Sequence, residues 1–306
     1  MQQMEEKTEE PVIRLDSVDK YNKLYGFETR HPLVAVVDLR KATTSVNHVR
    51  FNYGLYALWL KHGQQCSIRY GRQNYDYQEG TIVSFAPGQA VEVLMAENVE
   101  QADAVGLLFH PDIIHGTVLG KCIDDYHFFD YDSAEALHLS VREQQVIVDV
   151  LGSINSELEM PVDRHSQTIL VDRIKLVLDY CQRFYDRQFI TRHKVNSDVL
   201  TAFEQNLKEY FNSGEAERSG LPTVAYFADK AFLTPGYFGD LIKKETGLTA
   251  QQLIQNKLVA LSKQFLLDSR YTINQVSAYL GFLYPQHFSR FFKTHVGMSP
   301  KEYKDS

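Results

Sequence analysis

The C-terminal third of this 306-residue chain contains one sequence pattern twice. Residues 234–249 and 284–299 align without a gap at an offset of 50 residues, so that Pro235 corresponds to Pro285. Towards its end each copy has a glycine followed by an apolar residue and a Thr or Ser. Internal repeats near this period indicate a duplicated supersecondary unit. This part of the chain is therefore predicted to fold as two similar modules.

Each copy predicts a short helix, a tight turn and a second helix. Apolar residues recur at helical spacing over 224–231 and 273–280, which predicts the two first helices. The proline in each copy predicts the start of a second helix, because proline in a first helical turn loses no hydrogen bond. We therefore expect two helix-turn-helix motifs, at about 223–246 and about 272–296.

A long helix is predicted to join the two motifs. Between Gln251 and Asp268 apolar residues follow helical spacing, and a helix of this length rises about 27 Å. Recognition helices one DNA turn apart on the same face of a duplex lie about 34 Å from each other. Helix starts are indicated by three capping boxes, namely Thr249 with Gln252, Thr272 with Gln275, and Ser299 with Glu302.

Residues 223–303 resemble the paired helix-turn-helix domain of the AraC/XylS transcription regulators. The match is strongest over 278–293, followed by Gly297–Pro300. Two small residues depart from the family pattern: Ser277, where the family usually carries alanine, and Ser262 in the connecting helix. The resemblance implies a transcription regulator that binds double-stranded DNA by sequence, mostly as an activator, with RNA polymerase as a partner.

The second recognition helix carries the side chains best suited to reading bases. Its amphipathic pattern predicts that three phenylalanines, Phe288, Phe291 and Phe292, turn inward. Gln286, His287 and Arg290 then face outward, and the resemblance gives these three positions contacts with bases. Gln can bond adenine and Arg can bond guanine in the major groove. Lys293 and Lys301 are predicted phosphate contacts.

The first recognition helix is less suited to base reading. By the same alignment its outward positions are Gly236, Gly239 and Asp240, of which the glycines offer no side chain. Asp240 is repelled by phosphate unless it accepts a hydrogen bond from a cytosine amino group. Lys243 and Lys244 follow and are predicted to contact phosphates. We therefore expect the second motif to supply most of the sequence discrimination.

Charge is divided unevenly along the chain. Residues 222–304 hold ten Lys and Arg against five Asp and Glu, a net charge of +5. The other residues hold 22 against 34, a net charge of −12. A basic region within an acidic protein favours local DNA binding and discourages indiscriminate binding elsewhere.

The whole chain is predicted to be an α+β protein with three segments. Residues 1–135 form a cupin-like regulatory domain, 136–195 a helical linker and possible dimerisation region, and 196–306 the all-α DNA-binding domain. Six short strand-like runs in the first segment predict a sandwich or small barrel: 33–39, 54–61, 65–70, 81–86, 90–95 and 104–110. Residues 77–88 are similar to the turn and strand of cupin-like sensor domains in this regulator family.

The β segment is a candidate for binding a small-molecule effector. Trp59, Tyr56, Arg69, Tyr70 and Arg72 would supply aromatic walls and cations for a carbohydrate-like or anionic ligand. The alternative is that the aromatic residues belong to the core. The histidines are scattered without a His-x-His pair, so no metal site and no cofactor are predicted.

Two heptad-like apolar seams occupy the predicted linker, one over 147–158 and one over 170–184. They indicate either packing within the chain or pairing of two protomers, and the resemblance favours a homodimer. Cys66, Cys122 and Cys181 form no CxxC pair, and neither a secretion signal nor a membrane-spanning run is recognisable, which predicts a cytoplasmic protein. The protein is not expected to be an enzyme; a metal-dependent cupin-fold enzyme and a ligand-independent architectural DNA-binding protein are the alternatives.

Overall fold

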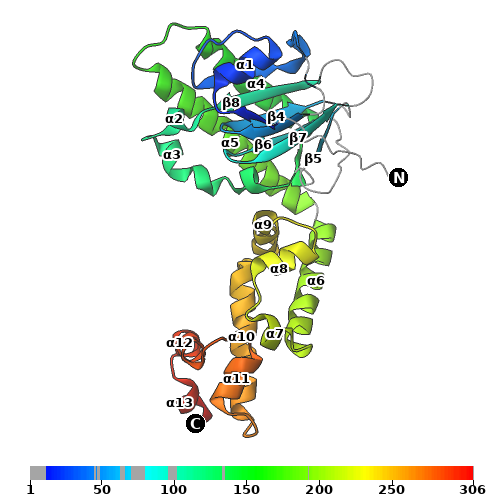
Figure 1. The fold of residues 1–306 in the computed structure, drawn as a ribbon, viewed down its shortest axis with the longest axis vertical. Helices are drawn as coiled ribbons and strands as arrows, with labels where there is room; N and C mark the ends of the chain where they lie inside the picture. The colour runs from blue at the N-terminus through cyan, green and yellow to red at the C-terminus, as the bar shows by residue number, and fades with distance from the viewer. Residues whose placement is uncertain are drawn as a thin grey trace, which may run out of the picture. The chain divides into compact units, whose positions relative to one another are not determined.

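The computed structural model describes residues 12–44, 46, 49–62, 66–69, 80–95, 102–132, 135–191 and 193–305. The chain divides into two compact units, Met1–Gln188 and Phe189–Ser306. Figure 1 shows the strands grouped with helices α1 to α5, and helices α6 to α13 forming the second group. The division into regulatory, linking and DNA-binding segments predicted above stays a prediction.

The first unit contains two β-sheets. In the described residues their strands are β1 Val12–Leu15, β2 Val34–Asp38, β3 Val49–Tyr53, β4 Tyr56–Lys61, β5 Cys66–Arg69, β6 Thr81–Phe85, β7 Ala90–Met95, β8 Ala104–Phe109 and β9 Leu137–His138. One sheet has the order β1-β3-β7-β5 and the other the order β2-β8-β4-β6-β9. All of these pairings are antiparallel except that of β1 with β3. The six strand-like runs predicted from the sequence coincide with β2 and β4 to β8, whereas β1, β3 and β9 were not predicted.

An aromatic-rich core lies between the two sheets. It includes Phe51 from β3, Trp59 from β4 and Phe85 from β6, together with Tyr21 from helix α1, Val18–Tyr25. Strand β4 is buried along nearly its whole length, and β6 along all of it. Because successive side chains point to opposite faces, this sheet must be covered on both faces.

Further helical segments precede and follow β8, the last long strand of the first unit. The 3₁₀ helix η1 Leu39–Lys41 precedes it. The 3₁₀ helices η2 Ile123–Asp125 and η3 His127–Asp130 and the α-helices α2 Pro111–Ile114, α3 Val118–Cys122, α4 Val141–Leu158 and α5 Ser166–Thr191 follow it. Helix α4 begins at a capping box formed by Ser140 and Glu143, and it packs against β2. Arg187 on α5 forms a bidentate ion pair with Glu143, with distances of 3.0 and 2.9 Å.

Both heptad-like seams are buried within the single chain. On α4 the seam residues Ile147 and Ile154 have no exposed surface, and on α5 the same is true of Ile174 and Val177. The packing alternative therefore holds for these residues. A dimer of this protein would have to use other side chains.

The second unit is entirely helical in its described residues. Its helices are α6 His193–Asn212, α7 Glu215–Ser219, α8 Val224–Lys230, α9 Pro235–Thr246, α10 Ala250–Leu267, α11 Ile273–Tyr279, α12 Pro285–Val296 and α13 Pro300–Lys304. Helices α8 and α9 form one helix pair and α11 and α12 another, each packed against the other member of its pair and linked by the 18-residue helix α10. All three capping boxes predicted from the sequence are confirmed.

Each helix pair has its own aromatic core. In the first pair Phe203 of α6 lies edge-on to Phe227 and Phe238, at ring-centroid distances of 5.1 and 5.3 Å. In the second pair Phe282 packs on Phe288 and Phe291 at 5.4 Å from each. Helix α10 contacts α9, α11, α12 and α13. No described helix combines the length and the apolar character needed to cross a membrane.

Candidate functional sites

Helix α12 is a firmly anchored amphipathic helix with a polar outer face. Pro285 occupies its first turn, and Phe288 and Phe292 have no exposed surface. Phe291 is half-buried and stacks on the ring of His295 at 4.3 Å. Gly297 ends the helix in the left-handed conformation, and its N–H donates to the carbonyl of Lys293 at 2.9 Å. The aromatic anchors hold the outer face in a defined orientation.

The outer face of α12 presents the three predicted base-reading residues. Gln286, His287 and Arg290 are all exposed, and the His287 ring lies edge-on to Tyr284 at 5.3 Å. Within the part of the chain that the structure describes, neither Gln286 nor Arg290 uses its side chain in a hydrogen bond or ion pair. Both side chains are therefore available to an external partner.

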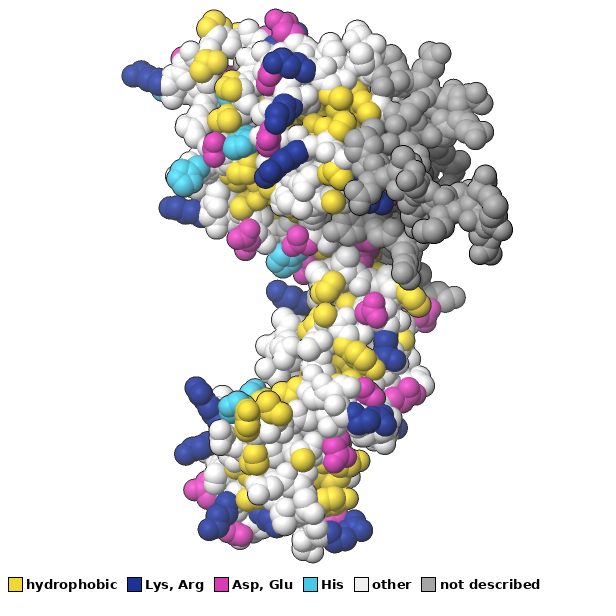
Figure 2. Space-filling model, viewed as in Figure 1, with side chains coloured by type: hydrophobic (Ala, Val, Ile, Leu, Met, Phe, Trp, Pro, Cys, Tyr) yellow, Lys and Arg dark blue, Asp and Glu magenta, His cyan; other side chains and the backbone are white. Residues whose placement is uncertain are grey.

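Basic side chains extend this face. Lys293 lies one further turn along α12 and Lys301 lies in α13, and both are exposed. Figure 2 shows Lys and Arg side chains along the edge of the second unit that α12 and α13 form. Near them, the backbone N–H and the side chain of Ser299 donate hydrogen bonds to the carboxylate of Glu302. These bonds, together with the positive charge of Lys293, lower the pKa of Glu302 below its usual value. Partial desolvation of the carboxyl opposes this shift but is outweighed. This carboxylate is thereby committed to the cap of α13.

Helix α9 presents a different surface at the corresponding positions. Gly236, Gly239 and Asp240 are half-buried, and Asp240 has a further interaction within the chain. Tyr237, which corresponds to His287 in the repeat, is only 5% exposed and packs on Phe189 at 4.9 Å. The alignment did not reveal that one position of this face is covered. Lys243 and Lys244 remain exposed at the end of the helix.

The turns of the two helix pairs differ by one residue. The first helices begin at Val224 and Ile273, an offset of 49, whereas the second helices begin at Pro235 and Pro285, an offset of 50. The residue after the C-cap of the first helix has positive φ in both turns, with values of 57° at Phe232 and 90° at Gly281.

The two positive-φ residues have opposite surroundings. Phe232 is 80% exposed. At Gly281 an added Cβ would lie 2.7 Å from the backbone of Gly220, which follows helix α7. Glycine is therefore required at Gly281 for two reasons, conformation and space, whereas the Phe232 side chain has space but an unfavourable backbone conformation.

The predicted ligand-binding residues of the first unit do not form one site in the described residues. Trp59 is 4% exposed and its ring lies against Gly106, where an added Cβ would be 2.3 Å from ring atoms. Tyr56 stacks on Phe109 at 4.9 Å and is half-buried. Trp59 is thus a core residue, which is the alternative stated above. The side chain of Arg69, and Tyr70 and Arg72 entirely, lie outside the described residues.

No cluster of three or more His, Cys, Asp or Glu side chains in the described part of the chain has the spacing of a metal site. Cys181 is fully buried, and burial raises the pKa of its thiol. A thiol in such surroundings is an inert core group. These observations add no candidate for catalysis.

A match to a known protein family lies within the second unit. A family model described as a helix-turn-helix domain matches residues 227–306. The probable transcriptional regulator LumQ of Photobacterium leiognathi is 33% identical over 82 residues, which are 27% of this chain and 33% of LumQ. YobQ of Bacillus subtilis (strain 168), an uncharacterized HTH-type transcriptional regulator, is 30% identical over 84 residues, 28% of this chain and 35% of YobQ.

Among solved structures, the C-terminal domain of AraT, a response regulator from Geobacillus stearothermophilus, is similar to this chain, with 21% sequence identity and a TM-score of 0.31. The match covers 35% of this chain and 84% of the AraT chain. The matched region spans about a third of the length of LumQ and of YobQ. The second unit contains a helix-turn-helix domain. This domain is of the AraC type, as the sequence predicted.

Proposed function

We propose that this protein is a sequence-specific DNA-binding transcription regulator. The observation that carries the proposal is the outer face of α12, where Gln286 and Arg290 are exposed, free of described partners and fixed from behind by Phe288 and Phe292. Gln and Arg are the side chains that bond adenine and guanine bidentately in the major groove. A rigid helix that presents both is suited to reading a short base sequence.

The two helix pairs act as helix-turn-helix units on successive major grooves. The second pair reads bases through Gln286, His287 and Arg290. In the first pair, Gly236, Gly239 and Asp240 are half-buried on α9. The backbone of this helix can approach the DNA closely, so that the first pair responds to the local shape of the duplex. Phosphate contacts come from exposed lysines, namely Lys243, Lys244, Lys293 and Lys301.

Control by a small-molecule effector and activation of transcription complete the proposal. A cytoplasmic homodimer would place four helix-turn-helix units on two half-sites, and an effector bound in the first unit would change how readily they engage. Such a ligand acts only through its different affinities for the two arrangements. Activation, which involves RNA polymerase, is proposed because regulators of this family mostly activate.

Selection of binding sites from random duplexes by the full-length protein tests DNA reading. We expect a defined motif for the wild-type protein. Gln286→Ala and Arg290→Ala should each relax the preference at one or two base positions and cost about 1–3 kcal/mol on the preferred site. Gly236→Ala should leave the bases read by α12 unchanged, because it adds no group able to bond a base, but its methyl group should weaken binding by hindering the close backbone approach of α9.

Two matched controls separate base reading from loss of a polar or charged side chain. Gln251→Ala removes an exposed glutamine from α10, and Arg218→Ala removes an exposed arginine from α7. Neither should alter the selected motif. If Gln286→Ala and Arg290→Ala leave the motif as it is in the wild-type protein, the proposed reading by α12 is wrong. If all duplexes are bound equally well, the protein binds DNA as an architectural protein.

A further inference from the structure

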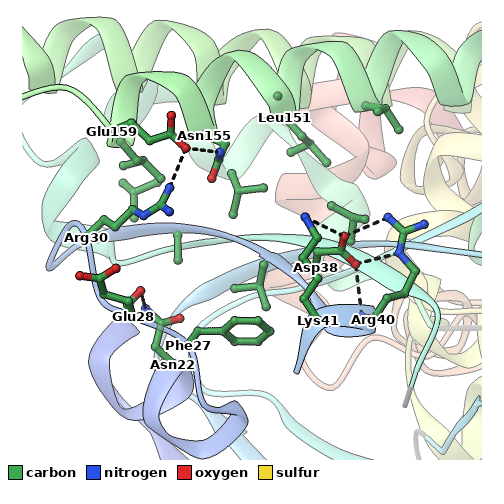
Figure 3. Close-up of a pocket in the computed structure, with 18 residues that line it drawn as sticks. Asn22, Phe27, Glu28, Arg30, Asp38, Arg40, Lys41, Leu151, Asn155 and Glu159 are labelled. Atoms are coloured by element: carbon green, nitrogen blue, oxygen red, sulfur yellow. Dashed lines mark hydrogen bonds and ion pairs between the residues drawn. The ribbon is translucent and has the colours of Figure 1, made fainter. Parts of the chain in front are cut away.

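A cleft of about 530 Å³ lies in the first unit between strand β2 and helix α4 (Figure 3). In the described sheet β2 is an edge strand, with β8 on one side. The loop after α1 and the 3₁₀ helix η1 close the two ends of the cleft. Its volume falls within the range of about 300–1,000 Å³ that is usual for small-molecule sites. Trp59 and Tyr56, the two predicted ligand residues whose side chains the structure describes, do not line the cleft.

Gly152 keeps one wall of this cleft open. It lies in the middle of α4 and lines the cleft, although glycine weakens the interior of a helix. An added Cβ at Gly152 would meet no atom within 4 Å, and its φ is not in the left-handed range. Neither backbone conformation nor crowding therefore requires glycine there. Because Gly152 has no side chain, it leaves the part of the cleft next to α4 unfilled.

The charged groups around the cleft are balanced. Three cations and three carboxylates line it, and Arg30 pairs with Glu159 at 2.8 Å while Arg40 pairs with Asp38 at 2.8 Å. Figure 3 shows these two pairs towards opposite ends of the cleft. Lys41 also lies 3.7 Å from Asp38. Arg40 and Lys41 share the carboxylate of Asp38, and Glu28 supplies the third carboxylate. Summed over the cleft the charges cancel, so the lining offers no net charge to an ionic ligand.

The stretch between the ion pairs is apolar and includes one unsatisfied acceptor. Val34 and Leu151 are buried residues on opposite walls. Asn22 is 2% exposed, and its Nδ2 donates to Thr29 Oγ1 at 3.1 Å. Its Oδ1 is buried and accepts no hydrogen bond from the described residues. Since a buried acceptor without a donor is unfavourable, an N–H or O–H that reaches Asn22 would be stabilised.

We propose that the β2–α4 cleft is the effector site, and that it binds a small molecule without net charge, with an apolar body and an N–H or O–H donor. The apolar body lies over Gly152, and the donor reaches Asn22 once the half-buried ring of Phe27 beside it moves aside. The role of the ligand as an effector rests on the proposed function, whereas the binding site itself does not.

Two dyes that share one ring system test the site on the full-length protein. N-phenyl-1-naphthylamine is uncharged and carries one N–H, and 8-anilino-1-naphthalenesulfonate adds a sulfonate to the same frame. We expect the neutral dye to bind at least about tenfold more tightly, by fluorescence titration. Gly152→Leu, which fills the cleft from a helical position, should weaken the neutral dye by about tenfold or more.

Ser156→Leu is the matched control, because Ser156 is exposed on the same helix one turn further and does not line the cleft. It should bind the neutral dye as the wild-type protein does. Equal binding by wild type and Gly152→Leu, or equal losses in both leucine variants, would overturn the site. Tighter binding of the sulfonate dye would overturn the assignment of a neutral ligand. Circular dichroism and thermal unfolding of each variant check that the protein stays folded.

DNA affinity measured with and without the neutral dye separates the two proposals. A dye-dependent change in the wild-type protein that disappears in Gly152→Leu supports the effector assignment. Unchanged DNA affinity with the dye bound overturns that assignment. If the wild-type protein prefers no duplex even without dye, the proposed function fails, while dye binding and its loss in Gly152→Leu still decide the site.

Discussion

Ser277 and Ser262 are two buried serines of the second unit with different hydrogen bonding. The Ser262 hydroxyl donates to the carbonyl of Leu258 at 2.6 Å, one turn earlier in α10. Ser277 is 1% exposed, and its Oγ has no partner among the described residues. A buried hydroxyl without a partner costs about 1–3 kcal/mol of stability. The two serines look equivalent in the sequence, and only their surroundings distinguish them.

Replacement of Ser277 by alanine should therefore stabilise the protein. We expect Ser277→Ala to raise the free energy of unfolding by about 1 kcal/mol in denaturant titrations. Ser262→Ala is the control, because it removes a satisfied hydroxyl and should leave stability unchanged or lower. A gain of equal size in both variants would show that small apolar side chains are simply favoured at these positions.

At the scale of elements, the two turns of the repeat share one backbone feature but not the residue that carries it. Each turn has a residue with positive φ after the first helix, which is Phe232 in the first turn and glycine only in the second. A bulky side chain in this conformation costs about 1–2 kcal/mol. Phe232 is too exposed for much compensation from burial. The first turn is thus the more strained of the two.

Phe232→Gly should relieve that strain. We expect the free energy of unfolding to rise by about 0.5–1 kcal/mol, since glycine also loses more chain entropy on folding. Phe232→Ala keeps the unfavourable conformation and should change stability little. Gly281→Ala should destabilise the protein, because its Cβ would meet the backbone of Gly220. Thermal unfolding of the three variants checks this order, and a gain from Phe232→Ala as large as that from glycine would contradict it.

The end of helix α10 has a local pH dependence. Hydrogen bonds from the side chain and backbone N–H of Arg270 lower the pKa of Asp268 from 3.8 to about 2. A lowered pKa means that the contribution to stability is present above pH 3.8 and is lost as the pH falls through about 2. Carboxyl chemical shifts in a pH titration should give this midpoint. Arg270→Ala should return it towards 3.8, and an unchanged midpoint would show that Arg270 is not the cause.

For the whole molecule, charge separates a basic C-terminal segment from an acidic remainder. The net charges are +5 over 222–304 and −12 elsewhere. Lys293→Ala or Lys301→Ala should weaken binding to all duplexes alike and reduce the slope of log affinity against log salt by about 1. Lys208→Ala, an exposed lysine on α6, should leave the slope unchanged. A loss restricted to the preferred sequence would mean that Lys293 or Lys301 reads bases.

Local signals predicted most of the second unit and the main strands of the first. Proline, capping residues and helical spacing placed the helices of the repeat within a residue or two. Helix α1 was not predicted, although Ser17 and Gly26 cap it. The burial of Tyr237 by Phe189 and the cleft that joins Asn22 to Gly152 depend on residues far apart in the chain. Such contacts have no local pattern, so they could not be predicted from spacing.

The extra residue in the second turn limits how the two modules could be recombined. A chimera that carries the α12 sequence in place of α9 can be aligned on the first helices or on the prolines. Alignment on the first helices displaces every transplanted side chain by one position, a rotation of about 100° around the helix axis. Gln286 and Arg290 would then turn away from the groove. A graft intended to transfer base preference must therefore be joined at the proline.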